Sequence, residues 1–194
     1  MLPSTRRQVR IADVLGRRLP GLTMVLENIH DPHNVSAILR SCDAVGVVGV
    51  ELLYTLEKFP RIGKKSSSSA SKWVDRRKHT SVNDCFATLH AEGFRILATR
   101  IAPEAPTLFD ADLTGPVAFV LGNEHRGVSD EAARLADGLV QIPMRGMIES
   151  LNVSVASAVL LYEALRQRLM RGHLPVPALP ADTYQNLLQD WLHR

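Results

Sequence analysis

The segment from Ile142 to Ala158, which reads IPMRGMIESLNVSVASA, constrains the fold of this chain more than any other stretch. It begins as the end of an apolar strand, turns at Gly146, and continues as a helix predicted from about Leu151 to Arg171. The first turns of this helix, Val153 to Leu161, are apolar or small on every side, whereas a surface helix has one polar face. We therefore expect these turns to be buried all round, enclosed by the rest of the chain or by a second subunit.

Short apolar runs alternate with helical patterns through the rest of the chain, which predicts an α/β fold. A strand at Leu22–Glu27 is followed by a helix that ends at Gly46 and by a second strand at Val47–Tyr54. Such a βαβ unit implies parallel strands joined by a right-handed crossover. Further strands are expected at Phe94–Arg100, Pro116–Gly122 and Gly138–Pro143, with helices opened by Ser81 and Ser129 and flanking helices at Ser4–Arg18 and Asp182–Leu192.

At 194 residues the chain is expected to form a single domain, long enough to bury roughly 70% of the surface that its unfolded form exposes. We divide it into a basic N-terminal helix (residues 1–20), a core (21–172) and a C-terminal helical tail (173–194). The longest apolar runs are shorter than the roughly 20 residues that cross a bilayer, and the N-terminus lacks the apolar core of a signal peptide. We expect a cytoplasmic protein with no membrane partner.

Several common chemistries leave no signature in this sequence. Cys42 and Cys85 lie in different predicted helices and form no CxxC pattern, so we expect ordinary buried thiols. The seven histidines show no close ligand spacing such as HExxH, and we expect no metal. No GxGxxG, P-loop or GxSxG motif follows a predicted strand. The sequence thus argues against an ordinary Rossmann or ATPase fold and against a serine hydrolase.

The net charge of +3 is distributed unevenly. Residues 1–20 carry +4 and residues 61–79 carry +6, so the remaining chain carries −7. Clustered Lys and Arg on an acidic body are what binding to a phosphate backbone requires, because each contact releases counterions. A solvated helix face and a basic loop would give the same charges. The candidate nucleic-acid contacts are Arg6, Arg7, Arg10, Arg17, Arg18, Lys64, Lys65, Lys72, Arg76 and Arg77.

Residues 56–80 interrupt the alternation with Pro60, Gly63, a run of serines and many basic residues. A connection this long in a compact domain is usually functional or disordered, and we expect a substrate loop that orders on binding. Trp73 lies within it, and two roles are open for this side chain. It either stacks on a base or anchors the loop to the core.

Ligands of a doubly wound parallel sheet bind at the carboxyl ends of the strands, so the turns after the strands should carry the chemistry. Three such turns are distinctive: Asn34–Arg40 (NVSAILR), Leu121–Gly127 (LGNEHRG) and the segment Ile142–Ala158. At these turns the sequence resembles the SPOUT class of RNA ribose 2′-O-methyltransferases, and within it the TrmH family. The matching positions are Asn34, Ala37 and Arg40, then Leu121, Gly122, Glu124 and Gly127, then Ile142 through Ala156.

Asp31–Arg40, Ser69–His79 and the C-terminal YQNLLQDWLHR look like the branch of this family that methylates guanosine 18 in the D-loop of tRNA. The resemblance implies a homodimer that uses S-adenosylmethionine and whose C-terminal segment passes through a loop of the chain, as a deep trefoil knot. The basic segments would then grip the tRNA backbone. Alternatives within the class are ribose 2′-O-methylation of rRNA or of the tRNA wobble position. A non-catalytic RNA-binding protein that retains the fold is the alternative outside it.

The resemblance also implies a cofactor site. It places S-adenosylmethionine against Thr99, Leu121, Gly122, Ile142 and Leu151. Adenine needs an apolar slot with a few backbone partners, and glycine permits close approach. Ile142 and Leu151 would serve equally well as core residues.

The catalytic residues that the resemblance implies are Arg40, Asn34, Glu124, Ser150 and Asn152. An arginine at this place is sometimes described as a base, but a guanidinium is effectively always protonated. We expect Arg40 to stabilise the developing 2′-oxyanion and to clamp a phosphate. For Asn34, helix capping is the expected main role, with orientation of Glu124 or the RNA as the alternative. Glu124 would position Arg40 or the target, or else face solvent. Ser150 and Asn152 would hold Arg40 or the target, or cap the last core helix.

Overall fold

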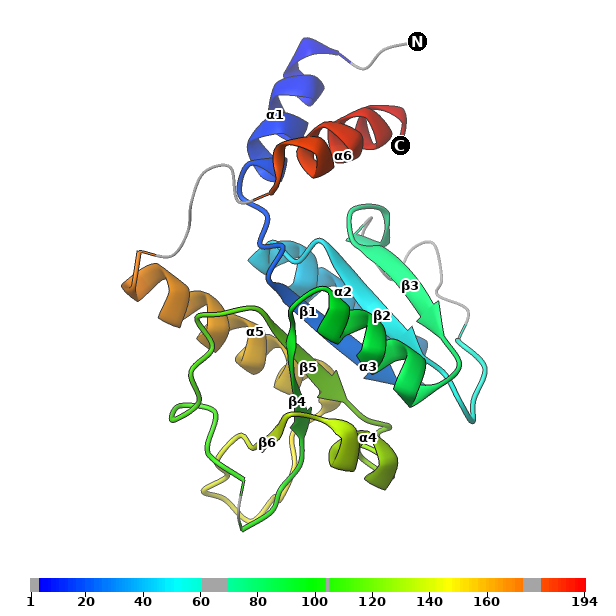
Figure 1. Ribbon diagram of the computed structural model, residues 1–194, viewed down its shortest axis with the longest axis vertical. Helices are drawn as coiled ribbons and strands as arrows, with labels where there is room; N and C mark the ends of the chain where they lie inside the picture. Colours follow the sequence, from blue (N-terminus) through cyan, green and yellow to red (C-terminus); the bar gives the residue numbers. More distant parts are fainter. Residues whose placement is uncertain (1–3, 61–69, 104, 173–178) are drawn as a thin grey trace.

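The computed structural model of this protein describes residues 4–60, 70–103, 105–172 and 179–194 (Figure 1). Within them, six strands form one sheet in the order β3-β2-β1-β5-β4-β6, and every neighbouring pair is parallel. The strands are β1 (Leu22–Glu27), β2 (Gly49–Leu53), β3 (Asp75–His79), β4 (Arg95–Thr99), β5 (Val117–Leu121) and β6 (Gly138–Val140). The helices are α1 (Thr5–Leu15), α2 (Pro32–Val45), α3 (Val82–Ala91), α4 (Asp130–Leu135), α5 (Val153–Met170) and α6 (Ala181–His193).

The predicted alternation is confirmed, and local signals in the sequence set most of its boundaries. β1 spans the predicted residues and is buried along its whole length. Asp31 caps α2 by accepting a hydrogen bond from a backbone N–H of the first turn, and Gly46 ends the helix with a φ of 97°. Ser81 and Ser129 cap α3 and α4 with their side chains in the same way.

Helices cover both faces of the sheet (Figure 1). Successive residues of a strand point to opposite faces, so β1 contributes to two separate cores. On one face Met24 packs with Ile38 of α2 and Leu160 of α5. On the other, Val25 packs with Phe86 of α3, in the core that also includes α4. This layering leaves the turns at the carboxyl ends of the strands at one edge of the sandwich, where a ligand can reach them.

The prediction of a continuous loop over residues 56–80 is wrong, because Asp75–His79 forms the edge strand β3 beside β2. The side chains of β3 are charged and, apart from His79, exposed, a composition typical of edge strands that avoid pairing with other chains. Arg77 donates two hydrogen bonds of 2.8 Å to the buried carboxylate of Glu51 in β2. The Nε2 atom of His79 lies 2.6 Å from the same carboxylate. Charge pairing rather than an apolar alternation holds this strand, so its sequence carries no strand periodicity.

The N-terminal helix ends at Leu15, before the predicted end at Arg18. Arg18 is only 1% exposed, and its guanidinium donates to the backbone oxygen of Val47 and to the carboxylate of Asp43. It also lies 4.8 Å from the centroid of the Trp191 ring. The prediction that Arg18 contacts RNA is therefore wrong, because the protein itself encloses this side chain.

The C-terminal helix α6 docks on α1 of its own chain (Figure 1). Its Trp191 meets Trp73 from the basic segment, with ring centroids 4.9 Å apart. Of the two roles left open for Trp73, the structure shows the anchoring one. Lys64 and Lys65, both predicted to bind RNA, lie outside the described residues.

Helix α5 is enclosed by its own chain on one side only, so the single chain provides part of the burial expected from the chain or a second subunit. Leu160, Leu161 and Ala164 are fully buried, where α5 packs on α2 and the sheet. In contrast, Val155 and Tyr162 are 49% and 52% exposed. The apolar start of the helix therefore presents a second face that this single chain does not cover.

No helix in the described parts of the chain combines the length and the apolar character needed to cross a membrane. Cys42 and Cys85 are free and buried, as expected. Burial raises the pKa of each thiol to about 12.

Candidate active site

A cavity of about 930 Å³ lies at the carboxyl ends of β4, β5 and β6. The turn after β5 and the segment between β6 and α5 form most of its wall. A volume near the upper end of the range for small-molecule sites suits a ligand that is longer than a single nucleobase. All five residues predicted to bind the cofactor line this cavity: Thr99, Leu121, Gly122, Ile142 and Leu151.

Gly122 occupies the tightest point of this wall. A Cβ atom placed on it would lie 2.0 Å from the carbonyl carbon of Gly127 and 2.1 Å from the nitrogen of Val128. The turn after β5 folds back over Gly122 and is closed by a hydrogen bond of 2.8 Å from the Gly127 N–H to the oxygen of Asn123. From the sequence, we explained Gly122 by the close approach of a ligand. The structure shows that the fold of the turn itself leaves no room for a side chain at this position.

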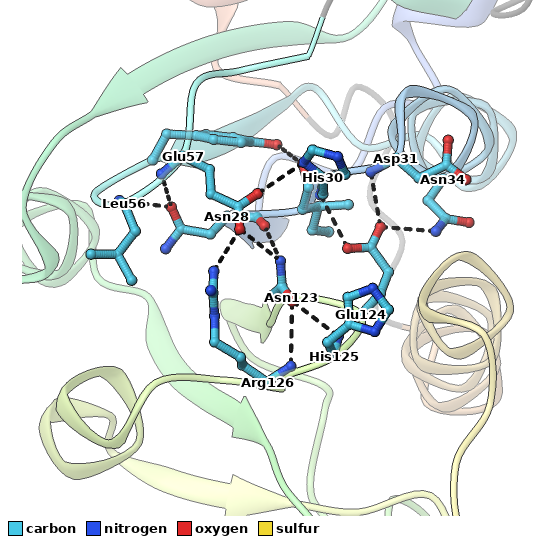
Figure 2. Close-up of polar contacts among 12 residues, drawn as sticks. Asn28, His30, Asp31, Asn34, Leu56, Glu57, Asn123, Glu124, His125 and Arg126 are labelled. Atoms are coloured by element: carbon cyan, nitrogen blue, oxygen red, sulfur yellow. Dashed lines mark hydrogen bonds and ion pairs between the residues drawn. The ribbon is translucent and has the colours of Figure 1, made fainter.

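Glu124 lies at the tip of this turn and faces the start of α2 (Figure 2). Its carboxylate accepts hydrogen bonds from the backbone N–H groups of His30 (3.1 Å) and Asp31 (3.2 Å) and from Nδ2 of Asn34 (2.9 Å). Partial burial alone would raise the pKa of Glu124, but these hydrogen bonds outweigh it and lower the pKa below its ordinary value. Of the roles left open for Glu124, the structure therefore contradicts the solvent-facing one, because hydrogen bonds from three donors hold its carboxylate.

Asn34 and Asn152 continue this arrangement from α2 to α5. The side chain of Asn152 donates from Nδ2 to Oδ1 of Asn34 at 3.1 Å, while its own Oδ1 caps α5 by accepting from the N–H of Ser154. Asn34 does not cap α2, because Asp31 does, so the role expected as the main one for Asn34 is wrong. The structure thus joins Glu124, Asn34 and Asn152 into one relay of hydrogen bonds.

Ser150 and Arg40 are the two predicted catalytic residues outside this relay. Ser150 is exposed and lines the cavity beside Asn152. Arg40 is exposed on α2, six residues beyond Asn34 and therefore about 9 Å further along the helix axis. The described lining of the cavity does not include Arg40.

A second group of hydrogen-bonded residues, which the sequence patterns did not indicate, surrounds the same turns (Figure 2). Asn28 follows β1 and is 4% exposed, with a positive φ of 51°. Asn123 is 6% exposed and donates to the Asn28 carbonyl oxygen at 2.8 Å and to Glu57 at 3.3 Å. The available signal was an asparagine directly after an apolar strand, since Asn adopts positive φ more readily than other non-glycine residues.

The basic residues predicted to contact RNA fall into different states. Arg17 forms an ion pair with Asp13 of α1, and Arg77 pairs with Glu51 and Glu92. Five of the predicted contacts are exposed and lie on α1 or on the segment before and within β3, without a carboxylate partner among the ion pairs of the described residues: Arg6, Arg7, Arg10, Lys72 and Arg76.

Metal ligands were not expected, and the described residues contain no group of three or more His, Cys, Asp or Glu side chains placed to hold an ion. The donors that the cavity does offer suit an organic cofactor. Apolar side chains such as Leu121 and Ile142 line it together with the backbone of the turn after β5. S-adenosylmethionine, with an adenine and a polar amino-acid end, fits a wall of this composition.

Comparisons with known proteins agree with this geometry. The model of the SpoU rRNA methylase family matches residues 21–162. The tRNA (guanosine(18)-2′-O)-methyltransferase of Thermus thermophilus is 47% identical over 188 residues, which are 97% of this chain and 96% of that protein. The protein of the same name from Escherichia coli is 43% identical over 86% of this chain and 72% of its own length. The crystal structure of the A. aeolicus TrmH/SpoU tRNA modifying enzyme aligns with a TM-score of 0.90 and 37% identity, covering 97% of this chain and 95% of that one.

Two further relatives are matched over less of their own length. A 23S rRNA (guanosine-2′-O-)-methyltransferase of Coxiella burnetii is 39% identical over 78% of this chain but 61% of that protein. The methyltransferase AviRb from Streptomyces viridochromogenes, crystallised with AdoMet, has a TM-score of 0.69 and 29% identity, over 81% of this chain and 61% of its own. The chain therefore belongs to the SpoU methylase family, on the branch of the tRNA (guanosine(18)-2′-O)-methyltransferases.

Proposed function

We propose that this protein transfers a methyl group from S-adenosylmethionine to the ribose 2′-oxygen of guanosine 18 in tRNA. The observation that carries the proposal is the relay of Glu124, Asn34 and Asn152 at the mouth of a cavity that suits the cofactor. The 47% identity over 97% of this chain to a tRNA (guanosine(18)-2′-O)-methyltransferase supports this substrate over rRNA or the wobble position.

Residues of the cavity hold the cofactor in this proposal. Leu121, Ile142 and Leu151 provide an apolar slot, while Thr99 and Gly122 line the floor beside the ends of β4 and β5. When bound, S-adenosylmethionine supplies an electrophilic methyl group. The protein contributes position and charge, and it requires no metal.

The relay orients the reacting ribose. Glu124 stays ionised, fixes Asn34, and through it the side chain of Asn152 beside Ser150. On the exposed side of α2, the guanidinium of Arg40 meets RNA that enters over the relay, clamps a phosphate and stabilises the developing 2′-oxyanion.

The deep trefoil knot implied by the family resemblance is also part of this proposal. Residues 105–116, in the connection between β4 and β5, form hydrogen bonds with two points of the later chain, one after β6 and one in α5. The N–H of Leu108 donates to the oxygen of Gln141 after β6 at 2.8 Å, and the N–H of Leu113 donates to the side chain of Gln167 late in α5 at 2.9 Å. The chain segment from Gln141 to Gln167 therefore lies against this connection at both of its ends. Such close contact is what a C-terminal segment threaded through the connection requires.

A second copy of the same chain is the proposed cover for the open face of α5. Val155, Tyr162 and Leu169 recur every seven residues and are each about half exposed, so they form one apolar stripe along the helix. A homodimer packed through this stripe would complete the burial that the sequence predicted. Sedimentation at micromolar concentration checks this, and a monomer would contradict it.

With tRNA as substrate, we place the protein in the cytoplasm, as one domain with terminal helices that serve tRNA binding.

The decisive experiment measures transfer of labelled methyl from S-adenosylmethionine to unmodified tRNA transcripts and to rRNA fragments, by wild type and by Arg40→Ala. We expect 2′-O-methylguanosine at position 18, and a rate reduced about 10² to 10³-fold in the variant, the usual effect of losing one charge-stabilising donor. Label on rRNA or at the wobble position would reassign the substrate. Binding of tRNA and cofactor without transfer would indicate a non-catalytic RNA-binding protein.

A further inference from the structure

Asn28 is the one non-glycine residue in the described part of the chain with a positive φ, 51°. It stands directly after β1 and is 4% exposed. A left-handed conformation is unfavourable for residues with a Cβ atom and persists where the surroundings fix it. The contacts of its side chain show what those surroundings are.

The amide of Asn28 binds an entire turn after the neighbouring strand β2 (Figure 2). Its Oδ1 accepts from the consecutive backbone N–H groups of Thr55 (3.0 Å), Leu56 (3.1 Å) and Glu57 (3.3 Å). Its Nδ2 donates to the hydroxyl of Thr55 at 3.1 Å. These four hydrogen bonds of the buried amide are therefore directed at residues 55–57.

The backbone of Asn28 binds the third turn, the one after β5. Its carbonyl oxygen accepts from Nδ2 of Asn123 at 2.8 Å. The Oδ1 of Asn123 in turn accepts from the N–H groups of His125 (3.0 Å) and Arg126 (3.3 Å), which shapes the turn around Glu124. Since β2, β1 and β5 are adjacent in the sheet, Asn28 fastens the turns of three neighbouring strands together.

Glu57 adds a second connection between the same turns. One of its oxygens accepts from Arg126 at 2.6 Å, and the other lies 3.1 Å from Nδ1 of His30. His30 and Glu124 are linked through the backbone N–H of His30. Glu57 is placed for these contacts by the hydrogen bond from its own N–H to Asn28.

We propose that Asn28 is a positioning residue for methyl transfer: its buried amide locks the turn after β2 and its backbone oxygen the turn after β5, so that Glu124 is held against Asn34. Asn28 is not among the residues that line the cavity, and it acts through Glu124 rather than on the substrate. The inference rests on the proposed function for its activity readout. Displacement of a catalytic constellation by about 1 Å commonly costs about 100-fold in rate, so a loosened turn should appear in kcat.

Two substitutions separate the amide from the backbone conformation. Asn28→Gly keeps the positive φ at no steric cost but removes the amide and leaves three N–H groups without their acceptor. Asn28→Asp keeps an acceptor for the same three groups, and the Thr55 hydroxyl can donate to it. Asn83→Ala is the matched control, since it removes an exposed asparagine amide whose contact is a 3.4 Å hydrogen bond to Glu131.

The variants are compared with wild type for kcat and KM on tRNA transcripts, for S-adenosylmethionine affinity by calorimetry, and for Tm. We expect Asn28→Gly to lower kcat at least about 10-fold with cofactor affinity within about 2-fold of wild type, because the cavity wall itself is intact. Asn28→Asp should restore most of kcat, and Asn83→Ala should match wild type. A role in stability alone would lower Tm without this loss of kcat in the folded enzyme.

A double-mutant cycle with Glu124→Gln tests the route of action. If Asn28 acts through Glu124, Asn28→Gly should reduce kcat far less in the Glu124→Gln background than in wild type. Additive effects, an unchanged kcat in Asn28→Gly, or failure of Asn28→Asp to rescue would each overturn the inference. Active wild type with any of these results leaves the proposed function standing, whereas a wild type that transfers no methyl group to tRNA defeats both.

Discussion

At the scale of single residues, the site is built from amides and one carboxylate whose partners are all fixed. The family resemblance of the sequence pointed to Asn34, Glu124 and Asn152, and the structure places them in contact. It did not reveal Asn28 or Asn123, since a buried asparagine after a strand looks like an ordinary turn residue. It misassigned Arg18 because charge alone does not distinguish an exposed cation from one enclosed by backbone oxygens.

The pH dependence of stability should reveal the anchored state of Glu124. Its folded-state pKa is lowered below 4.5, so its hydrogen bonds contribute fully above about pH 4.5 and are lost as pH falls through the lower folded-state value. We expect Glu124→Gln to reduce the free energy of unfolding by about 1 to 2 kcal/mol at pH 7. The difference from wild type should shrink as urea titrations are repeated from pH 5 down to pH 3. A difference that stays constant over this range would show that the carboxylate is not ionised in the folded protein.

Gly122 provides a steric test of the turn after β5. Because a Cβ atom would overlap the backbone of Gly127 and Val128, Gly122→Ala should destabilise the protein by about 3 kcal/mol or more and abolish cofactor binding. Gly115→Ala is the matched control, since nothing lies within 4 Å of a Cβ atom there. Urea unfolding and calorimetry measure the two effects. Equal stability of the two variants would mean that the turn does not cross Gly122 as closely as the structure has it.

At the scale of elements, the buried strands and the capped helices were predicted from the sequence. Buried strands appear as apolar runs, and helix boundaries are marked by capping residues such as Ser, Asp and Gly. The prediction failed at β3, whose stability comes from Arg77 and His79 pairing with Glu51 rather than from apolar side chains. For α5 the apolar pattern did not tell which residues pack within the chain and which form the face that a single chain leaves open.

Helix α5 is fastened near its end by Arg168, which is 5% exposed. Its guanidinium donates to the backbone oxygens of Leu113, Gly21 and Gly115. Arg168→Met should leave these oxygens without donors and lower the free energy of unfolding by about 3 kcal/mol, measured by urea titration. Arg171→Met, which removes a half-exposed side chain 3.7 Å from Asp112, should change it by less than about 0.5 kcal/mol. Similar effects of the two substitutions would contradict the fastening role.

At the scale of the whole molecule, the clusters of Lys and Arg include side chains that are paired with carboxylates of the protein and side chains that are exposed to a ligand. Neighbouring arginines of β3 differ in this respect: Arg76 is exposed, while hydrogen bonds to Glu92 and Glu51 raise the pKa of Arg77 and offset its charge. From the sequence, Arg76 and Arg77 were both predicted to contact RNA. Which of them pairs with a residue of β2 depends on the register of the two strands, which the sequence alone does not show.

The salt dependence of tRNA binding should separate these two arginines. If Arg76 contacts a phosphate, Arg76→Gln should flatten the slope of log K against log salt concentration by about one unit. Arg77→Gln should change the slope less, although it destabilises β3. Filter binding between 50 and 300 mM salt measures both slopes. An unchanged slope for Arg76→Gln would exclude this strand from the tRNA interface.

The two buried cysteines lie on opposite faces of the sheet, Cys42 in α2 and Cys85 in α3. With both thiols fully buried and their pKa raised to about 12, neither reacts with an alkylating reagent while its layer stays closed. Each cysteine is therefore a natural reporter for the helical layer that covers it. Pulsed alkylation read out by mass spectrometry can time the opening of the two layers independently, without any engineered label.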